Sequence, residues 1–228
     1  MIDAIIVPQG AEYQAVKKGL NKVSIQSPLL ISIPIGIKQI ATALSKENFW
    51  RFQPKTVLMI GLCGSLSSQY SVGDAVLYQA CYSQQTGTKI ATDRKLNQLI
   101  TKQLMLSYSQ EQISLAVGIT SDRVITKIAE KRQLARDFEV DIVDMESFAY
   151  LELLQQQKVA VSVLRIVSDD LNHSLPNLET AISESGNLKP LAIAKAIIKQ
   201  PLASAHLVNG SLKGLQKLQQ VTSNLFGS

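Results

Sequence analysis

The sequence predicts an α/β protein with a mixed, mostly parallel central sheet flanked by helices. Short runs rich in Val and Ile alternate with segments of helical period along most of the chain. Runs that are apolar on both faces of a strand are typical of parallel sheets covered by helices. The chain has 228 residues, 46% of them hydrophobic. This length and composition exclude a disordered chain and allow one large core.

The predicted elements follow one another in an order typical of parallel sheets. The expected strands share short apolar, β-branched runs and cover residues 2–7, 29–33, 56–60, 74–82, 115–120, 140–143 and 159–167. The expected helices share apolar residues at helical spacing and cover residues 11–20, 37–49, 93–107, 127–137, 146–157, 188–200 and 204–225. Because strand and helix alternate through most of the chain, the sheet is expected to be built from βαβ units.

Charge is distributed unevenly along the chain. The formal net charge is +5, from 23 Lys and Arg against 18 Asp and Glu. Residues 185–228 contain five lysines and no Asp, Glu or Arg, so residues 1–184 carry 18 charges of each sign. Nucleic-acid-binding proteins cluster basic residues with exposed aromatics or Gly, whereas aromatics are 5% of this chain. We therefore expect no nucleic-acid partner.

The cysteines, histidines and N-terminus favour a cytoplasmic protein without a metal. Cys63 and Cys81 lie in apolar segments predicted as strands, so reduced core thiols are expected. Two histidines, His173 and His206, are too few for a histidine-rich metal site. The first apolar run ends at Pro8, which makes it too short for a signal peptide or a membrane span. No metal and no cofactor are expected.

Three carboxylates follow strands at the points where the strands end. Glu12 follows the first strand, Glu146 the sixth and Asp169 the seventh. Each has an ordinary explanation as a helix cap or first-turn residue. However, ligands of parallel sheets bind beyond the carboxyl ends of the strands, and like charges gathered there raise one another's pKa. The three carboxylates are therefore the first candidates for a functional site.

Two separated motifs resemble the signature of the nucleoside phosphorylase and nucleosidase superfamily. They are VDMES at residues 143–147 and RIVSD at residues 165–169. GLCGSL at 61–66 resembles the glycine loop of that family, and Glu12 stands where its nucleosidases carry an acid. The resemblance implies the family's three-layer fold. DRVI at 122–125, followed by Glu130 and Lys131, is most similar to the hopanoid-associated branch.

The resemblance implies a role for each residue around the leaving base and the sugar. Asp169 would protonate the departing purine or stabilise its charge, and Ser168 would hold it in register. Glu146 would accept hydrogen bonds from two ribose hydroxyls and stabilise the cationic sugar, and Met145 would form an apolar wall. The implied substrate-binding residues are Glu146, Met145, Ser168, Gly64, Leu62 and Val124.

The same resemblance bears on the nucleophile. Glu12 would help to activate water, with Arg165 nearby to orient it. Many phosphorylases of the family place an arginine just before the glycine loop, where this chain has the apolar residues 57–60. Phosphate needs cationic donors, and a carboxylate at Glu12 would repel it. Both features favour water over phosphate.

Two positions near the glycine loop depart from the family, and one arginine has no fixed role. Leu62 stands where a serine is usual, and Ser65 replaces a glycine. Arg123 could pair with Asp122 or Asp144, or reach a polar part of the substrate.

The expected function is that of a purine nucleosidase, an enzyme that hydrolyses the N-glycosidic bond of a 5′-substituted adenosine. The substituent could be of the adenosylhopane type or of the methylthioadenosine and adenosylhomocysteine type. The alternatives are a phosphate-dependent phosphorylase and a non-catalytic nucleoside-binding relative. Because the family often builds its 5′ pocket partly from a neighbouring subunit, a homo-oligomer is expected.

The C-terminal residues are expected to form a separate addition to the fold. Residues 1–185 would form the nucleosidase-like domain, and residues 186–228 a basic helical extension packed on it. In the last helix an apolar face opposes Lys213 and Lys217. Its members are Leu207, Val208, Leu212, Leu215, Leu218 and Leu225. The helix is expected to pack on the sheet or on a subunit; the alternative is peripheral contact with an anionic membrane.

Overall fold

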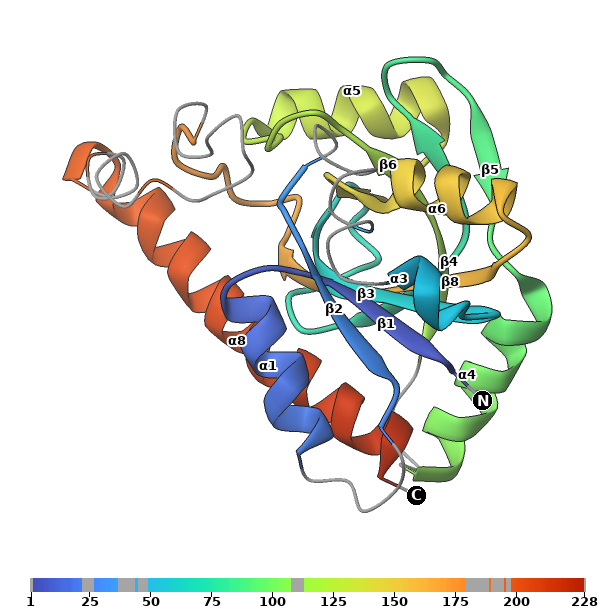
Figure 1. Cartoon of the computed structure of the whole chain (residues 1–228). Helices are drawn as coiled ribbons and strands as arrows, with labels where there is room; N and C mark the ends of the chain where they lie inside the picture. The colour runs from blue at the N-terminus through green and yellow to red at the C-terminus, as the bar shows by residue number, and fades with distance from the viewer. Residues whose placement is uncertain are drawn as a thin grey trace.

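The chain folds around one eight-stranded sheet (Figure 1). A computed structural model describes residues 2–21, 27–36, 44, 49–107, 113–178, 189, 195 and 198–227. The strands are β1 (Ala4–Pro8), β2 (Leu29–Ile33), β3 (Thr56–Ser65), β4 (Ala75–Ser83), β5 (Lys89–Ala91), β6 (Ser114–Thr120), β7 (Ile142–Asp144) and β8 (Ala160–Asp169). The helices are α1 (Ala11–Leu20), α3 (Phe49–Phe52), α4 (Arg94–Ser107), α5 (Ile128–Phe138), α6 (Ser147–Gln156) and α8 (Pro201–Phe226).

The sheet is mixed and curls so far that part of it closes on itself. The strand order is β2-β1-β3-β7-β6-β4-β5, and β8 pairs with both β3 and β4. Strands β3, β8, β4, β6 and β7 therefore form a closed ring. Five of the eight strand pairings are parallel and three are antiparallel. The predicted α/β fold with a mostly parallel sheet is confirmed.

The central strands are buried on both faces, as their composition predicts. In β1, Ile5 and Val7 belong to a core cluster shared with α1, α4 and α8. Ala4 and Ile6 face the other side of the sheet and belong to the cluster that includes α6. Alternate side chains of a strand point to opposite faces, so a continuous apolar run fills both layers. Figure 1 shows α1 and α8 side by side along one flank of the sheet.

Several boundaries differ from the sequence prediction. Strand β3 does not end at residue 60: it continues through the glycine segment to Ser65, paired with β8 as far as Gly64 and with β7 at its last two residues. Strand β5, which was not predicted, forms an antiparallel pair with β4. The predicted helix 188–200, and all of helix 37–49 except Leu44 and Phe49, lie outside the described residues, apart from positions 189, 195 and 198–200.

Helix α8 buries part of the apolar face that the sequence predicts. Its buried apolar residues are Leu218, Val221 and Leu225, whereas Val208 and Leu212 are 45% and 54% exposed. The prediction placed all of these residues except Val221 on one face, packed on the sheet or on a subunit. Leu218 and Leu225 are buried within this chain, whereas packing of Val208 and Leu212 on a subunit stays a prediction. The helix begins at Pro201, three residues before the expected start, with the proline in the first turn. Proline is favoured there because the first helical N–H groups have no partner.

A glycine lets α8 approach the end of β8. A Cβ atom at Gly210 would overlap the backbone carbonyl of Ser168. Although Ala is the better helix former by about 1 kcal/mol, we expect Gly210→Ala to lower the free energy of unfolding by about 1–3 kcal/mol through this overlap. Urea denaturation measures it. Asn209→Ala, at the neighbouring exposed position, should be neutral or stabilising, and equal losses in both variants would contradict the explanation.

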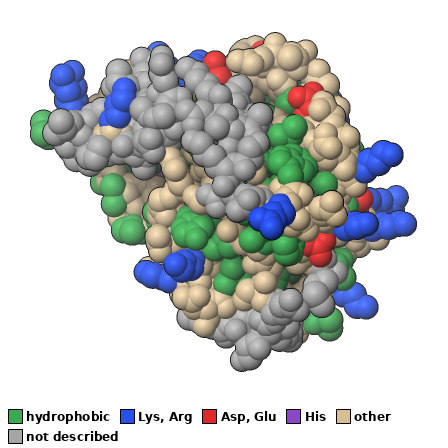
Figure 2. All heavy atoms as spheres, in the orientation of Figure 1, with side chains coloured by type: hydrophobic (Ala, Val, Ile, Leu, Met, Phe, Trp, Pro, Cys, Tyr) green, Lys and Arg blue, Asp and Glu red, His purple; other side chains and the backbone are tan. Residues whose placement is uncertain are grey.

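The basic residues do not gather into one surface patch on the face shown in Figure 2. Lys and Arg side chains lie in several separate places around hydrophobic side chains. Among the described residues, none of the helices combines the length and apolar character needed to cross a membrane. Peripheral membrane contact through the basic C-terminal residues stays a prediction.

Candidate active site

One pocket gathers most of the residues that the sequence singles out. Its volume is about 370 Å³, within the range of small-molecule sites. Eight of the nine expected site residues line it, and Arg165 alone does not. The eight are Glu12, Leu62, Gly64, Val124, Met145, Glu146, Ser168 and Asp169. The three carboxylates predicted to converge therefore lie around one cavity, and their chemical roles remain predictions.

Arg165 lies behind the pocket as a fully buried cation. Its guanidinium is 3.3 Å from Asp144 Oδ2 and 3.4 Å from Glu146 Oε2. It also donates a hydrogen bond of 2.9 Å to Ser147 Oγ. Burial lowers the pKa of Arg165, but the surrounding carboxylates, Asp144 first, raise it by more, so the net pKa is raised. Arg165 is thus a permanent positive charge that organises acidic groups around it.

Glu12 occupies the first turn of α1 and points toward β3. Its Oε2 accepts a hydrogen bond of 2.7 Å from the backbone N–H of Leu62. Burial raises the pKa of Glu12 to about 8; Arg165 opposes this effect and Glu146 adds to it. A carboxyl that titrates near neutral pH can both accept and release a proton during turnover. The largest cause is burial, with the like-charge effect predicted from the sequence as a smaller contribution.

The two glycines of β3 make room for the charged groups. A Cβ at Gly61 would overlap the Arg165 guanidinium and the Glu12 carboxylate. A Cβ at Gly64 would lie 2.9 Å from Asp169 Oδ2. The glycines that resemble the family's glycine loop therefore lie inside strand β3, because side chains from α1 and β8 occupy the space that a Cβ would need.

Glu146 is held between a backbone N–H and the arginine. Its Oε1 accepts a hydrogen bond of 3.0 Å from Gly36, which follows β2, while Oε2 faces Arg165. Burial raises the pKa of Glu146, Arg165 lowers it, and Asp144 raises it. Gly36 has φ of 85°, a conformation that favours glycine. The end of β2 thus contributes to the position of the carboxylate.

Asp144 also lines the pocket, and its carboxylate holds neighbouring site residues in place. Its carboxylate accepts hydrogen bonds from Tyr78 Oη at 2.9 Å and Thr120 Oγ1 at 2.8 Å. It also contacts Ser147 Oγ and pairs with Arg165. With both oxygens used in this way, Asp144 fixes the start of α6 and the orientation of Arg165.

Lys131 is a site residue that sequence reasoning missed. It is fully buried on α5, and its Nζ contacts Asp169 Oδ2 and donates a hydrogen bond of 2.7 Å to the carbonyl of Asp170. A signal was present in the sequence, because Lys131 lies three residues before the buried Leu134 on the inward face of the predicted helix. A lysine in an apolar stripe indicates a buried partner.

Arg123 has a partner that the sequence prediction did not consider. Its Nη1 is 3.3 Å from Glu130 Oε2, and the two side chains form an ion pair. The Arg123 side chain is 49% exposed and lines the pocket. It is the one Lys or Arg among the described residues that line this cavity.

The C-terminal helix is part of the pocket. Leu207, Ser211 and Leu215, spaced four residues apart on α8, line it together with Leu62 and Met145. The sequence prediction treated residues 186–228 as an addition beyond the nucleosidase-like segment. The described part of residues 186–228 also supplies one wall of the cavity.

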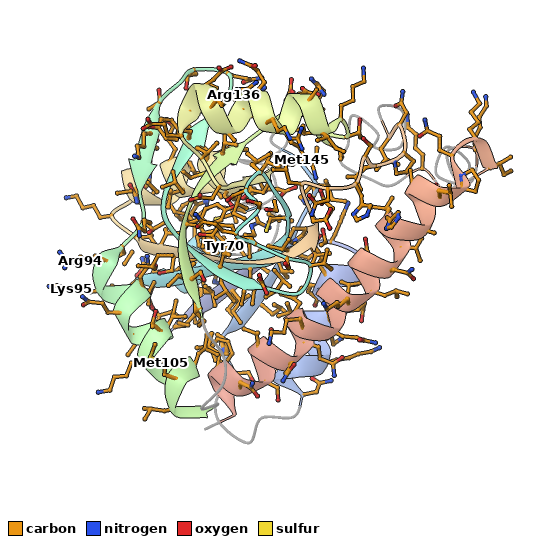
Figure 3. All side chains as sticks on the ribbon, turned by 180° about the vertical axis from the view of Figure 1, so that it is seen from behind. Tyr70, Arg94, Lys95, Met105, Arg136 and Met145 are labelled. Carbon is orange, nitrogen blue, oxygen red and sulfur yellow. The ribbon has the colours of Figure 1, made fainter. Side chains whose placement is uncertain are left out.

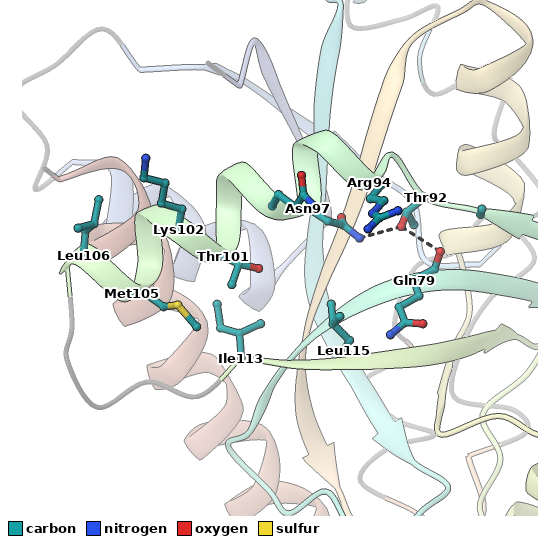
Figure 4. Close-up of a pocket in the computed structure, with 12 residues that line it drawn as sticks. Gln79, Thr92, Arg94, Asn97, Thr101, Lys102, Met105, Leu106, Ile113 and Leu115 are labelled. Atoms are coloured by element: carbon teal, nitrogen blue, oxygen red, sulfur yellow. Dashed lines mark hydrogen bonds between the residues drawn. The ribbon is translucent and has the colours of Figure 1, made fainter.

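A larger hollow lies away from these groups, between α4 and the strands β4 and β6 (Figure 4). Its volume is about 890 Å³, and neither Asp nor Glu is present among its described lining residues. Met105 and Leu106 of α4 are 57% and 77% exposed there. Figure 3 shows Arg94 and Lys95 projecting outward from the same helix. Because Arg94 and Lys102 are its only charged groups among the described lining residues and neither Asp nor Glu accompanies them, this hollow is a poor candidate for the chemistry.

The described residues offer no cluster of three or more His, Cys, Asp or Glu side chains arranged to hold a metal ion. Cys63 and Cys81 are free and buried. The charged groups in and directly behind the pocket are the carboxylates, the guanidinium groups of Arg123 and Arg165, and the Lys131 ammonium.

Comparison with known proteins gives one family and several related folds. The phosphorylase superfamily pattern matches residues 8–199. The futalosine hydrolase of Helicobacter pylori strain 26695 superposes with a TM-score of 0.71 at 15% identity, covering 97% of this chain and 95% of that chain.

Two further solved structures have similar folds. The 5′-methylthioadenosine/S-adenosylhomocysteine nucleosidase of Helicobacter pylori, with butyl-thio-DADMe-Immucillin-A, gives a TM-score of 0.65 at 15% identity over 97% of this chain and 98% of that chain. The Campylobacter jejuni nucleosidase of the same name gives 0.63 at 15% identity over 96% and 100%. No curated protein sequence matches this chain significantly.

Proposed function

Because this chain belongs to the phosphorylase superfamily, we propose that it is a purine nucleosidase that hydrolyses the N-glycosidic bond of a 5′-substituted adenosine. One observation carries the proposal: Glu12, Glu146 and Asp169 line a single pocket. Breaking a ribosyl C–N bond leaves positive charge on the sugar and negative charge on the base, as in glycoside hydrolysis. A carboxylate beside the sugar would stabilise the positive charge, and a carboxyl beside the base would neutralise the negative charge by giving it a proton.

The sugar would lie against Glu146 and Met145. A carboxylate has two oxygens that match the vicinal 2′ and 3′ hydroxyls of ribose, and its charge stabilises an oxocarbenium-like sugar. Arg165 and Gly36 hold Glu146 in place, so the carboxylate is oriented before the nucleoside arrives. Preorganised charge of this kind needs little rearrangement in the transition state.

Water would attack from the side of Glu12. The Glu12 carboxylate accepts the proton of the attacking water, and its own orientation is fixed by the backbone N–H of Leu62. Asp169, on the opposite side of the bond, donates a proton to the departing purine. The two carboxyls thus act as general base and general acid.

The charge of the pocket favours water over inorganic phosphate. Phosphate binds where several cationic donors converge, whereas the carboxylates outnumber the single arginine among the described lining residues. Arg123 is the feature that favours the second candidate function, a phosphate-dependent phosphorylase. Its pairing with Glu130 reduces the charge available to an anion.

The 5′ substituent would face the apolar wall. Leu207 and Leu215 of α8 line the pocket together with Leu62, Ile35 and Leu178. Apolar side chains favour an uncharged, hydrophobic group at this position. We infer a nucleoside with an alkylthio-like or lipid-like 5′ group. The hopanoid-associated branch, a homo-oligomer and a cytoplasmic location stay predictions.

Product analysis tests the proposal directly. The purified protein is incubated with methylthioadenosine, adenosylhomocysteine, adenosine, inosine and an adenosylated hopanoid, with and without phosphate. We expect adenine and a free sugar from a 5′-substituted adenosine, at a rate that phosphate does not change. Adenine release that requires phosphate, with a sugar 1-phosphate as product, would support the phosphorylase. Binding without turnover of any nucleoside would indicate a non-catalytic relative.

A further inference from the structure

Lys131 forms a buried ion pair with the proposed general acid. The Lys131 side chain is 0% exposed and the Asp169 side chain 14% exposed. Asp169 lines the pocket, whereas Lys131 lies behind it, in contact with Asp169 Oδ2 and the Asp170 carbonyl. The three parts are therefore arranged in series: the pocket, the carboxyl and the ammonium.

Fold stability does not require an ammonium at this position. Lys131 is in the first turns of α5, where the helix dipole disfavours a cation. The inward face of α5 is otherwise apolar, with Leu134 in a core cluster beside Ile125 and Val143. Replacing a buried ion pair with well-packed apolar residues is often neutral or stabilising. The pair therefore points to chemistry at Asp169.

The pair also determines which proton is available to the leaving base. The net pKa of Asp169 is raised, because burial raises it by more than the Lys131 ammonium, the largest opposing influence, lowers it. A carboxylate alone is acceptor-only and has no proton to give. An ammonium has three N–H groups, and unlike a guanidinium it can release a proton. The transferable proton of this pair can thus be stored on the nitrogen and delivered through the carboxyl.

We propose that Lys131 is a positioning residue that orients Asp169 and supplies the proton which Asp169 passes to the leaving purine. The inference rests on the proposed nucleosidase function. As the C1′–N9 bond breaks, its electron pair passes to the purine. The Lys131 ammonium gives a proton to Asp169, and Asp169 gives one to a ring nitrogen of the purine.

The remaining protons balance through water. Water adds to C1′ of the sugar cation, and its proton goes to the Glu12 carboxylate. The products are a neutral purine, the free sugar, the Asp169 carboxylate and a neutral Lys131 amine. The amine then takes up one proton from solvent and Glu12 releases one, so the starting state is restored.

Other charged or titratable groups face the pair but have different partners or positions. Asp170 turns its carboxylate to His173, 2.9 Å from Nδ1, and Glu130 on α5 pairs with Arg123. Asp170, His173, His206 and Lys213 line a second pocket together with Asp169, and Cys63 is near enough for the Asp169 charge to raise its pKa. Of the described residues, Lys131 is the cation that forms an ion pair with the Asp169 carboxylate.

Three variants test this role: Lys131→Met, Lys131→Arg and the control Lys127→Met. Lys127 precedes Lys131 by four residues, is exposed and makes no side-chain cap. For each, kcat is measured from pH 5.5 to 8.5 with the nucleoside that the wild type cleaves fastest, and is divided by the wild-type kcat at the same pH. The ratio removes the titration of Glu12, which all four proteins share.

The expected ratios differ in their dependence on pH. At pH 8.5, Lys131→Met should lose at least about tenfold in kcat, the scale of a general acid. The loss should shrink as the pH falls, because Asp169 then takes up its own proton. Lys131→Arg should stay low throughout, because a guanidinium keeps Asp169 ionised and does not release its proton. Lys127→Met should match the wild type at every pH.

Other outcomes would overturn the inference. If Lys131→Arg restores wild-type kcat, the pair only orients Asp169; if the Lys131→Met ratio is flat across the pH range, Lys131 is only structural. Thermal unfolding of each variant identifies loss of fold, and Lys131→Gln then replaces an unfolded Met variant with the same expected trend. A wild-type protein that cleaves no nucleoside would instead overturn the proposed function, a result distinct from active protein with unaffected Lys131 variants.

Discussion

Replacing Glu12 with glutamine should lower kcat for nucleoside hydrolysis by about 10²–10⁴-fold, the usual contribution of a general base. Glutamine has nearly the same size and can still accept the hydrogen bond from the Leu62 N–H. It cannot take a proton from water. Because the change affects the transition state more than the bound nucleoside, KM should change by less than about threefold.

The pH dependence of the two proteins separates this role from a structural one. The raised pKa of about 8 means that Glu12 is largely protonated at neutral pH in the free protein. A base must be ionised, so kcat/KM of the wild type should rise as the pH increases through about 8. The kcat/KM of Glu12→Gln should not show this rise, because its amide does not titrate.

The measurement is kcat/KM between pH 6 and 9.5 for the wild type and Glu12→Gln. Glu152→Gln makes the same chemical change at an exposed position of α6 and should keep both the rate and the rise of kcat/KM with pH. If this rise persists in Glu12→Gln, another group is responsible for the titration. Unchanged kcat would exclude Glu12 as the base.

Much of the fold was predictable because the central strands are apolar on both faces. The parallel order of β1, β2 and β3 follows from such runs separated by helical segments. The ring closed by β8 was not predictable in the same way, since its pairing with both β3 and β4 joins residues far apart in the sequence. The glycines of β3 led to a predicted strand end at residue 60, because glycine indicates a turn when its surroundings are unknown.

The carboxylates of the site were predictable from their positions after strands. The other residues that line or support the pocket were not predictable in this way, because they belong to elements whose sequence patterns do not indicate a site. Lys131 belongs to a helix with an amphipathic pattern, and Leu207 and Leu215 belong to a C-terminal segment whose most distinct sequence feature is five lysines without Asp, Glu or Arg. Their places at the pocket depend on tertiary contacts of α5 and of α8 with the end of β8, which periodicity does not specify.

Replacing Asp169 with asparagine should lower kcat by about 10²–10⁴-fold, because the leaving purine then departs without a proton donor at its ring. Asparagine fits the space left by Gly64, where Asp169 Oδ2 lies 2.9 Å from the position of an absent Cβ. Steric change is therefore small, and the loss reports on acid chemistry. Release of the base in a single turnover measures it, with Asp137→Asn on the exposed face of α5 as the control.

The double variant Asp169→Asn, Lys131→Met decides whether the two residues act in one proton path. Residues that act in series lose little more together than the first loses alone, whereas independent residues multiply their losses. We expect the double variant to match Asp169→Asn within about threefold in kcat. Full activity in Asp169→Asn would remove Asp169 as the acid, and multiplied losses would place Lys131 outside its path.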